Sequence, residues 1–528
     1  MRKVTFLVLL AFVFCTGANA QEANVYAYGL KAEVTTGLSV KFSYSLNATA
    51  TSAKIKVSNG DEFALAGAEL TKGENKSVTK TLSATADGTY SWSITATAAD
   101  KSAPTQVFEG DIYNPWGLAV DNHFDSPFFG NIYVTNGRKT MASDLPGSVD
   151  QEDGIWAFNP QFRELGSATG VPAGWTGAVW DEAPGRLSVC ADGKVLAANG
   201  GNGVVTGSDA TVQAALMNPA DLSAPYEEIF IPGAEKSKLW NVWIADGKIY
   251  TFTYKPIYND APTPVIIDRL YHIKSYDFPD IGAATVIYDD KEATEIDGEG
   301  INGIGPQVWN TVVPVEGGFW MALNLDANDV LAGLPCVIFI NNSGKIVYQL
   351  TKDNGAFEGG SKGALAVNRD GSLIAFASYL DTDVPLGRKY IVYSVEKNAG
   401  GIPTKLTQLC IISAVRSTYC MAFDNANNFY AAAPGPEWIR GWAMPTTNSA
   451  TTNAPKAQAI KIGKVGISTP AVDVKVFVKG GQIKVVGGEL GKVFDLQGRI
   501  VGSAPEAKGI YLVQVKTDSG TVVKKIIK

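Results

Sequence analysis

A pattern of apolar and polar positions recurs six times between Pro115 and Pro445. In each recurrence an apolar or alternating run reaches a turn rich in Asp, Asn or Gly, and a second apolar run follows. GLAVDNHFDSPFFGNIYVTNG from Gly117 and VWIADGKIYTFTY from Val242 are two of these runs. Two strands around such a turn are typical of a β-hairpin, so this stretch predicts six hairpins.

The turn positions are separated by 71, 54, 70, 54 and 54 residues. They are Asp121, Asp192, Asp246, Glu316, Asp370 and Asp424. A recurring period with insertions, long enough for four strands each time, favours a β-propeller over a sandwich. We therefore predict an all-β protein with a six-bladed propeller over residues 109–445. Seven blades are the alternative, because the two longest spacings leave room for extra strands, and hairpins of unrelated sheets are another.

The first 20 residues predict a secretory signal peptide. Arg2 and Lys3 precede an apolar run from Val4 to Phe14, and the sequence Ala-Asn-Ala ends at Ala20. This is the basic, apolar and small-residue order that signal peptidase cleaves. We therefore expect an exported protein that reaches the cell surface or medium through the periplasm. Because no later segment has 18 consecutive apolar residues, we expect no transmembrane segment.

Residues 21–108 predict a separate small β-sandwich. LSVKFSYSL places Leu38, Val40, Phe42 and Tyr44 on one face of a strand, and GTYSWSITATA repeats this alternation. One buried and one wet face indicate antiparallel sheets. The run ADGTYSWSI resembles bacterial immunoglobulin-like modules, and this resemblance implies a spacer or a packing surface.

A run of Thr, Asn, Ala and Pro covers residues 446–462 and predicts a linker. Beyond it, residues 463–528 form short alternating stretches separated by Gly-Gly, Gln-Gly and Ser-Gly turns. These features predict a second small β-sandwich.

The formal charge of −7 is unevenly distributed along the chain: residues 463–528 carry +6, the signal carries +2 and residues 21–462 carry −15. The negative body argues against a nucleic-acid partner.

The C-terminal stretch resembles the C-terminal sorting domain of cargo of the type IX secretion system of Bacteroidetes. VFDLQGRIV, GIYLVQVKTDSG and the terminal VVKKIIK carry the resemblance. It implies secretion by that machinery, followed by release or attachment to surface lipopolysaccharide. The matching residues are Asp495, Gly498, Arg499, Gly509, Tyr511, Lys524 and Lys525.

Motifs of catalysis are scarce in this chain. It has only two histidines, His123 and His272, and it lacks a G-x-S-x-G elbow, an H-E-x-x-H helix and a phosphate loop. The mature chain keeps Cys190, Cys336, Cys410 and Cys420, for which disulfides and buried thiols are both open. Their spacing does not suit zinc, so we expect no metal cluster, and calcium is the one cofactor left open.

Tryptophan is concentrated in the propeller region, just before or within the predicted innermost strands. Loops entering those strands share a face with loops leaving the second strands, so their side chains can meet around the axis. Aromatic rings beside Asn, Asp and Arg suit a sugar, whose C–H face stacks while its hydroxyls need hydrogen-bond partners. The candidate ligand-binding residues are Trp116, Arg138, Trp180, Asn199, Trp240, Trp243, Tyr254, Trp309, Tyr379 and Asp381.

Three functions fit this sequence. The first is a non-catalytic propeller that binds a glycan or a surface protein. The second is a polysaccharide hydrolase or lyase, for which a pair of carboxylates is needed. The third is a structural protein of the envelope. Propellers that resemble the NHL and YVTN repeat families fit all three, so the fold alone does not choose.

Overall fold

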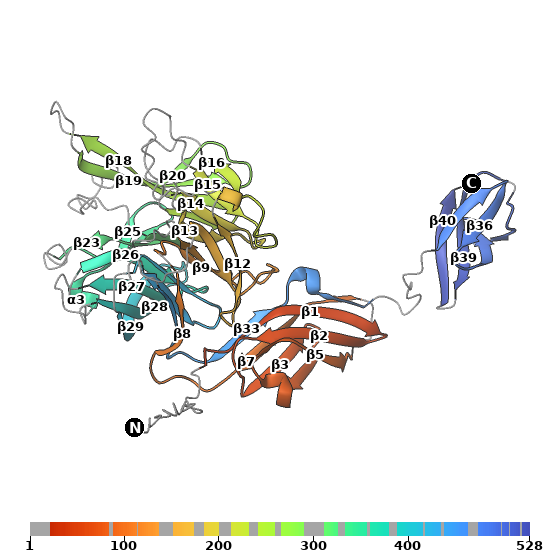
Figure 1. The fold of residues 1–528 in the computed structure, drawn as a ribbon, viewed down its shortest axis with the longest axis horizontal. Coiled ribbons are helices and arrows are strands. Elements are labelled where there is room, and N and C mark those ends of the chain that lie inside the picture. The colour runs from red at the N-terminus through yellow and green to blue at the C-terminus, as the bar shows by residue number, and fades with distance from the viewer. Residues whose placement is uncertain are drawn as a thin grey trace, which may run out of the picture. The chain divides into compact units, whose positions relative to one another are not determined.

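The computed structural model describes most of the chain after the predicted signal peptide. The described ranges are 22–83, 88–112, 114–136, 152–169, 171–173, 184–199, 213–231, 241–258, 266–289, 311–325, 333–355, 360–379, 388–414, 418–433, 438–462, 474–497, 499–505, 507–517 and 520–527. Their regular secondary structure is almost entirely strand (Figure 1). The all-β prediction is confirmed.

Six antiparallel sheets follow one another between residues 105 and 443. The first three are β9 (Leu118–Val120), β10 (Ile132–Asn136), β11 (Gly154–Phe158) and β12 (Glu164–Thr169); β13 (Pro184–Val189), β14 (Val195–Asn199), β15 (Gln213–Met217) and β16 (Glu227–Phe230); and β17 (Asn241–Ala245), β18 (Lys248–Tyr258), β19 (Ile266–Asp277) and β20 (Thr285–Asp289). Each strand pairs with the next one along the chain, as in a propeller blade.

The other three blades follow the same order. The fourth is β21 (Thr311–Val315), β22 (Gly318–Ala322), β24 (Val337–Asn341) and β25 (Ile346–Leu350); the fifth is β26 (Gly360–Val367), β27 (Leu373–Tyr379), β28 (Arg388–Lys397) and β29 (Pro403–Ala414), with β23 (Asn324–Leu325) added beside β26; the sixth is β30 (Cys420–Phe423), β31 (Phe429–Ala433), β32 (Trp438–Ala443) and β8 (Thr105–Asp111). The described short helices are η1 (Gly67–Leu70), η2 (Val171–Ala173), α3 (Lys352–Gly355) and η3 (Lys456–Gln458).

The six sheets close into one ring. The innermost strands β9, β13, β17, β21, β26 and β30 contact one another in that order, and β30 returns to β9. The sixth blade takes its outermost strand, β8, from before the first blade. In the described residues the ring therefore has the six blades that the sequence predicted, and not the alternative seven.

Packing between blades explains the long apolar runs of the sequence. The second strands β10, β22 and β31 are buried at every position, because each lies between two neighbouring blades. Phe319 in β22 illustrates this packing, since its ring meets that of Tyr250 in β18 of the neighbouring blade at 5.4 Å. A strand that is covered on both faces has no polar face, so the alternation expected of a half-exposed strand disappears.

Turns that start at Asn or Asp link many of the strands. In each turn the side-chain oxygen accepts hydrogen bonds from the backbone N–H groups two and four residues later. The starting residues are Asn159, Asn341, Asn398 and Asp424. The fourth residue of each turn has a positive φ, which suits Gly or Asn and places Phe162 in an uncommon conformation.

The N-terminal sandwich contains two packed sheets. One holds β1 (Ala27–Thr36), β2 (Ser39–Leu46) and β5 (Gly73–Thr81), and the other holds β3 (Ser52–Val57), β4 (Glu62–Leu65), β7 (Trp92–Thr97) and β33 (Ser449–Asn453). The ring of Phe42 in β2 meets Trp92 in β7 at 4.9 Å, which joins the two sheets. The sequence predicted the alternation of these strands, and the pairing confirms their antiparallel order.

The prediction of a linker over residues 446–462 is wrong. β33 adds to the edge of β7, and β34 (Ile460–Ile462) pairs with β6 (Gly88–Tyr90). Polar composition misled the prediction because β33 is an edge strand with one wet face, where Ser449 and Thr451 bond to threonines of β7. The boundary at residue 108 also shifts, because β8 belongs to the propeller.

A buried polar network joins the sandwich to the propeller. Asn24 and Asn428 exchange two hydrogen bonds, from Asn24 N–H to Asn428 Oδ1 (2.7 Å) and from Asn428 Nδ2 to the Asn24 carbonyl (3.0 Å). Asn428 Nδ2 also donates to Asp424 Oδ2 at 2.8 Å, and Tyr430 donates to the same oxygen at 2.8 Å. Beside the network, Tyr26 packs edge-on against Phe129 at 6.0 Å. The sandwich therefore contacts blades 1 and 6 at the face that carries the turns between first and second strands, which we call the turn face.

The C-terminal residues form a separate unit, described here by itself. It contains β35 (Lys475–Lys479), β36 (Gln482–Val486), β37 (Glu489–Phe494), β38 (Ile500–Val501), β39 (Ile510–Thr517) and β40 (Gly520–Ile527). Its core is centred on Val513 and Val515, both fully buried. Across the described ranges of the whole chain, no helix is long and apolar enough to span a membrane.

We predict that Asn428→Ala lowers the free energy of unfolding by about 2–4 kcal/mol, because several buried hydrogen-bonding groups lose their partners. Urea unfolding at pH 7 measures this loss. Asn425→Ala is the matched control: its side chain is half-buried and its bonds are long, at 3.3 and 3.4 Å, so a change below about 0.5 kcal/mol is expected. Equal losses for the two variants would contradict the role of the network.

Asp424 gives a pH-dependent prediction. Burial raises the pKa of this carboxyl to about 6, although hydrogen bonds from Asn428 and Tyr430 oppose the shift. Between the unfolded pKa near 3.8 and about 6, the folded protein holds a proton that the unfolded chain has lost, so this group stabilises the fold as pH falls. The wild type should therefore gain about 1 kcal/mol of stability relative to Asp424→Asn between pH 7 and pH 5, as measured by urea unfolding. A constant difference would rule out this titration.

Candidate functional site

The innermost strands begin at the face opposite the turn face, and we call it the mouth face. Trp116 stands just before β9, where the Thr135 hydroxyl accepts the N–H groups of Trp116 (3.1 Å) and Gly117 (2.7 Å). The half-buried indole of Trp116 stacks on Tyr419, with ring centroids 5.9 Å apart and planes inclined by 19°. Tyr419 stands just before β30, so the innermost strands of blades 1 and 6 bring these two rings together.

Arg186 places a positive charge beside this aromatic pair. It lies in β13 of blade 2, only 7% of its surface is exposed, and its Nη1 donates to the Trp116 carbonyl at 3.2 Å. Burial lowers the pKa of the guanidinium to about 10, while Cys420 and Tyr419 oppose the shift. The group therefore keeps its proton at neutral pH, and its charge is screened only weakly because little water reaches it.

Buried polar side chains are found near the start of the innermost strand in further blades. They are Asn241, Thr311, Ser361 and Thr418. Thr418, in blade 6, accepts a hydrogen bond from the Tyr390 hydroxyl (3.2 Å) and donates to the Ala432 carbonyl (2.7 Å). Polar groups at this depth are costly unless they are hydrogen-bonded, so the centre of the mouth face differs chemically from the apolar blade interfaces.

The residues predicted to bind ligand are only partly described. The side chains of Trp116 and Trp243 are described, and Trp243 is a half-buried residue of β17 that pairs with Tyr250. Asn199, Tyr254 and Tyr379 lie in β14, β18 and β27, but their side chains are outside the described part. Also outside the described residues are Arg138, Trp180, Trp240, Trp309 and Asp381.

Sequence reasoning missed Arg186 and Tyr419. Trp116 and Tyr419 each stand five residues before a turn aspartate, in WGLAVD and YCMAFD, whereas Arg186 stands six residues before Asp192 in RLSVCAD. Aligning the six hairpins on their turn positions would therefore have pointed to Tyr419 but not to Arg186. What the alignment could not supply is the fact that three different blades bring these side chains together.

The described residues give little indication of catalytic chemistry. Each histidine lies near an aspartate, with His123 Nδ1 3.4 Å from Asp121 and His272 Nδ1 3.5 Å from Asp289. Across the described ranges, no three metal-binding side chains converge. The four cysteines are free thiols, and burial raises the pKa of each above its usual value. Of the two alternatives for the cysteines, free thiols are therefore the one found, with Cys190, Cys336 and Cys420 buried and Cys410 half-buried.

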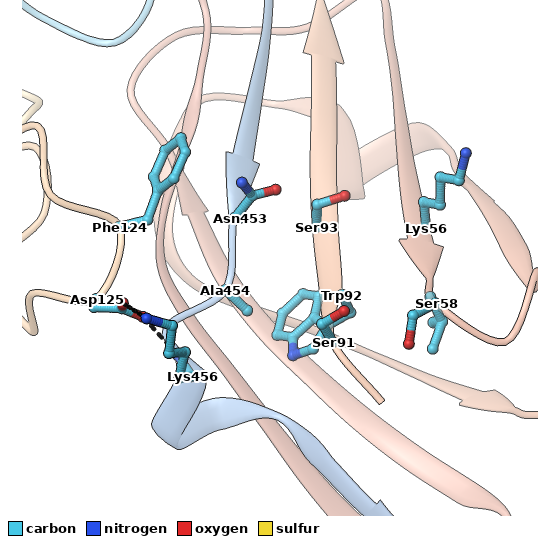
Figure 2. A pocket seen from close by; sticks show the side chains of 11 residues that line it. Lys56, Ser58, Ser91, Trp92, Ser93, Phe124, Asp125, Asn453, Ala454 and Lys456 are labelled. Atoms are coloured by element: carbon cyan, nitrogen blue, oxygen red, sulfur yellow. Dashed lines mark hydrogen bonds and ion pairs between the residues drawn. The ribbon is translucent and has the colours of Figure 1, made fainter. Parts of the chain in front are cut away.

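A groove of about 440 Å³ lies beside the N-terminal sandwich (Figure 2). Lys56, Ser93 and Asn453 form a row across three neighbouring strands at its edge, since Ser93 pairs with both of the others. Lys456 forms an ion pair with Asp125 at 3.1 Å on the opposite side. The groove offers hydroxyl, amide and ammonium groups to a small polar molecule, but it has no buried charge of the kind found at the mouth face.

Several residues of the predicted sorting signal meet in the C-terminal unit. Asp495 accepts the N–H groups of Gln497 (3.0 Å) and Arg499 (2.9 Å) and pairs with Arg499 Nε at 2.6 Å, which is the turn found between propeller strands. Tyr511 donates to the Ala507 carbonyl at 2.7 Å, and Gly509 lies beside its ring. Asp495, Arg499, Gly509 and Tyr511 line one pocket of about 650 Å³.

The other sorting residues do not line this pocket or lie outside the described residues. Lys524 and Lys525 are exposed on β40 and do not line the pocket. Gly498 lies outside the described residues. In sequence it is the fourth residue of the Asp495 turn, the position where other turns of this chain have a positive φ. The contacts between Asp495 and Arg499 thus have a local structural role that is independent of any role in sorting.

No family model matches this chain, and no curated protein matches it. Among solved structures, the chain is similar to a protein of unknown function from Bacteroides thetaiotaomicron, with 10% identity, a TM-score of 0.39, and 78% of this chain and 98% of that chain covered. A glucose dehydrogenase has 9% identity, a TM-score of 0.34 and coverages of 64% and 98%. The Dos1 propeller has 9% identity, a TM-score of 0.32 and coverages of 80% and 95%. At these scores the similarity carries no argument about function, and the propeller assignment rests on the strand pairing.

Proposed function

We propose that this protein is an exported β-propeller that binds a glycan at its mouth face. The stacked pair of Trp116 and Tyr419, brought together beside the buried charge of Arg186, is the observation that carries the proposal. The sandwich packs on the turn face at blades 1 and 6, which leaves the mouth face as the surface for a ligand. Loops placed on a rigid scaffold are where binding residues usually lie.

The aromatic pair favours a sugar. A half-buried indole offers an apolar surface to the C–H face of a sugar ring, and the neighbouring polar groups suit its hydroxyls. The backbone of Trp116 is held in place, since the Thr135 hydroxyl accepts the N–H groups of Trp116 and Gly117 before β9. Such preorganisation reduces the entropy lost on binding.

We further propose that residues 463–528 direct secretion through the type IX machinery to the cell surface or the medium. The proposal is supported by the resemblance of the C-terminal stretch to sorting domains and by the signal-like first 20 residues. Four of the matching residues gather around one pocket of the C-terminal unit, which offers a compact surface to a transport partner.

A glycan array probed with the mature chain, residues 21–528, tests the binding proposal. We expect a retained glycan that Trp116→Ala weakens by about tenfold, because stacking contributes on the order of 1 kcal/mol. Trp156→Ala, on β11 and away from the aromatic pair, is the matched control and should bind normally. Thermal unfolding of both variants checks that they fold. Absence of binding, or equal weakening by the two variants, would overturn the proposal, and shortened or unsaturated sugar products would replace it with the enzyme alternative.

Truncation before Lys464 tests the secretion proposal in the native host. The shortened chain keeps β34, so its propeller and sandwich should fold and accumulate in the periplasm. Fractionation followed by immunoblotting measures the distribution of the protein, with the full-length chain as the control. Normal arrival of the truncated chain at the surface would show that residues 464–528 are not required for export.

A further inference from the structure

We propose that the glycan bound at the mouth face is acidic, and that its carboxylate or sulfate group pairs with Arg186 while its ring lies against Trp116 and Tyr419. This inference rests on the proposed function and adds the chemical class of the ligand. It is carried by the position of one buried charge among three blades.

Arg186 extends from its own blade toward the centre of the mouth face. Its backbone belongs to β13 of blade 2, while its guanidinium donates to the Trp116 carbonyl of blade 1. It is also close enough to Tyr419 and Cys420 of blade 6 to interact with them electrostatically. Because β30, β9 and β13 are consecutive members of the inner ring, a side chain of β13 that reaches past blade 1 to blade 6 lies toward the axis.

A second cation acts on the same aromatic pair. Arg388 begins β28 in blade 5 and is half-buried. Burial raises the pKa of the Tyr419 hydroxyl, and the charges of Arg186 and Arg388 oppose this rise, so Tyr419 lies near two arginines that come from different blades. This is a different environment from the aromatic pairs of the blade interfaces, such as Tyr250 with Phe319, which lie in an apolar cluster.

The physical chemistry of a buried guanidinium selects an oxyanion. Its planar set of N–H donors matches the two oxygens of a carboxylate or sulfate, and the weak screening at a buried site strengthens their attraction. A sugar acid presents this group on the rim of a ring whose C–H face can stack on an indole. One ligand thus satisfies both the charge and the aromatic surface.

The charge of the rest of the molecule limits the ligand further. Residues 21–462 carry a formal charge of −15, so a long polyanion is repelled by most of the surface. A short oligosaccharide or a terminal acidic residue brings only its local charge to the mouth. We therefore expect a preference for short acidic glycans over long polymers.

Titration calorimetry of the mature chain tests the inference with three probes. They are a trimer of galacturonic acid, its fully methyl-esterified form, and a sulfated trisaccharide. The ester keeps the ring and removes the charge, so we expect the acid to bind at least tenfold more tightly. Tighter binding of the sulfated probe than of the acid would identify sulfate as the group that is recognised, and either anion binding above the ester supports the proposal.

Variants test whether Arg186 causes the preference for the acid over the ester. Arg186→Met should abolish the difference between acid and ester, while Arg186→Lys should keep part of it. If Arg186→Met does not fold, Arg388→Gln, at a half-buried position, should still reduce the difference several-fold. Arg163→Gln is the matched control, because Arg163 is exposed at the turn face and pairs with Glu74; it should leave the difference unchanged.

The outcomes distinguish a failure of the acidic-ligand inference from a failure of the proposed glycan binding. Equal binding of acid and ester, lost in Trp116→Ala, would overturn the acidic ligand and leave a neutral-glycan binder. An acid preference that survives both Arg186→Met and Arg388→Gln would show that the charge recognition lies elsewhere. If the glycan array and all three probes show no binding, the glycan-binding function and this inference fail together.

Discussion

Closure of the ring is the constraint on which the rest of this structure depends. Six blades are held in a circle only if the last blade is joined to the first, and here β8 joins them by pairing with β32. The hydrogen bonds of this pairing connect residues more than 300 positions apart in the chain. Because β8 comes directly after the N-terminal sandwich, the position of that sandwich is tied to the closing blade.

The chain returns to the sandwich once the propeller is complete. β33 pairs with β7, so the sheet of the sandwich contains strands from both sides of the propeller, and the Asn24–Asn428 network fixes the first described residues to blade 6. The network includes the buried Asp424, whose carboxylate accepts hydrogen bonds from Asn428 and whose pKa is raised by burial. The two domains therefore depend on each other through groups that tolerate substitution poorly.

The same geometry divides the propeller into two chemically different faces. The turn face carries short Asn- and Asp-initiated turns and contacts the sandwich at blades 1 and 6. The mouth face begins each innermost strand, and buried Thr, Asn, Ser and Arg side chains are found there in place of the apolar side chains between blades. Arg186 lies beside the Trp116–Tyr419 pair because the starts of the innermost strands meet at the mouth face, and these three residues stand near the starts of β13, β9 and β30.

The sequence by itself determined the local features: the hairpins, their number, the alternating strands of the sandwich and the turns at Asn and Asp. Each of these depends on periodicity or on backbone conformation over fewer than about 20 residues, and such information is contained in the local sequence. Trp116 could also be found in this way, because it begins an innermost strand. The tertiary structure alone decided that β33 is a strand of the sandwich, that β8 closes the ring, and that Arg186 lies beside Trp116 and Tyr419. These facts depend on pairings between distant residues, and a single sequence contains no local signal for the partner of an edge strand or for the neighbour of a buried charge.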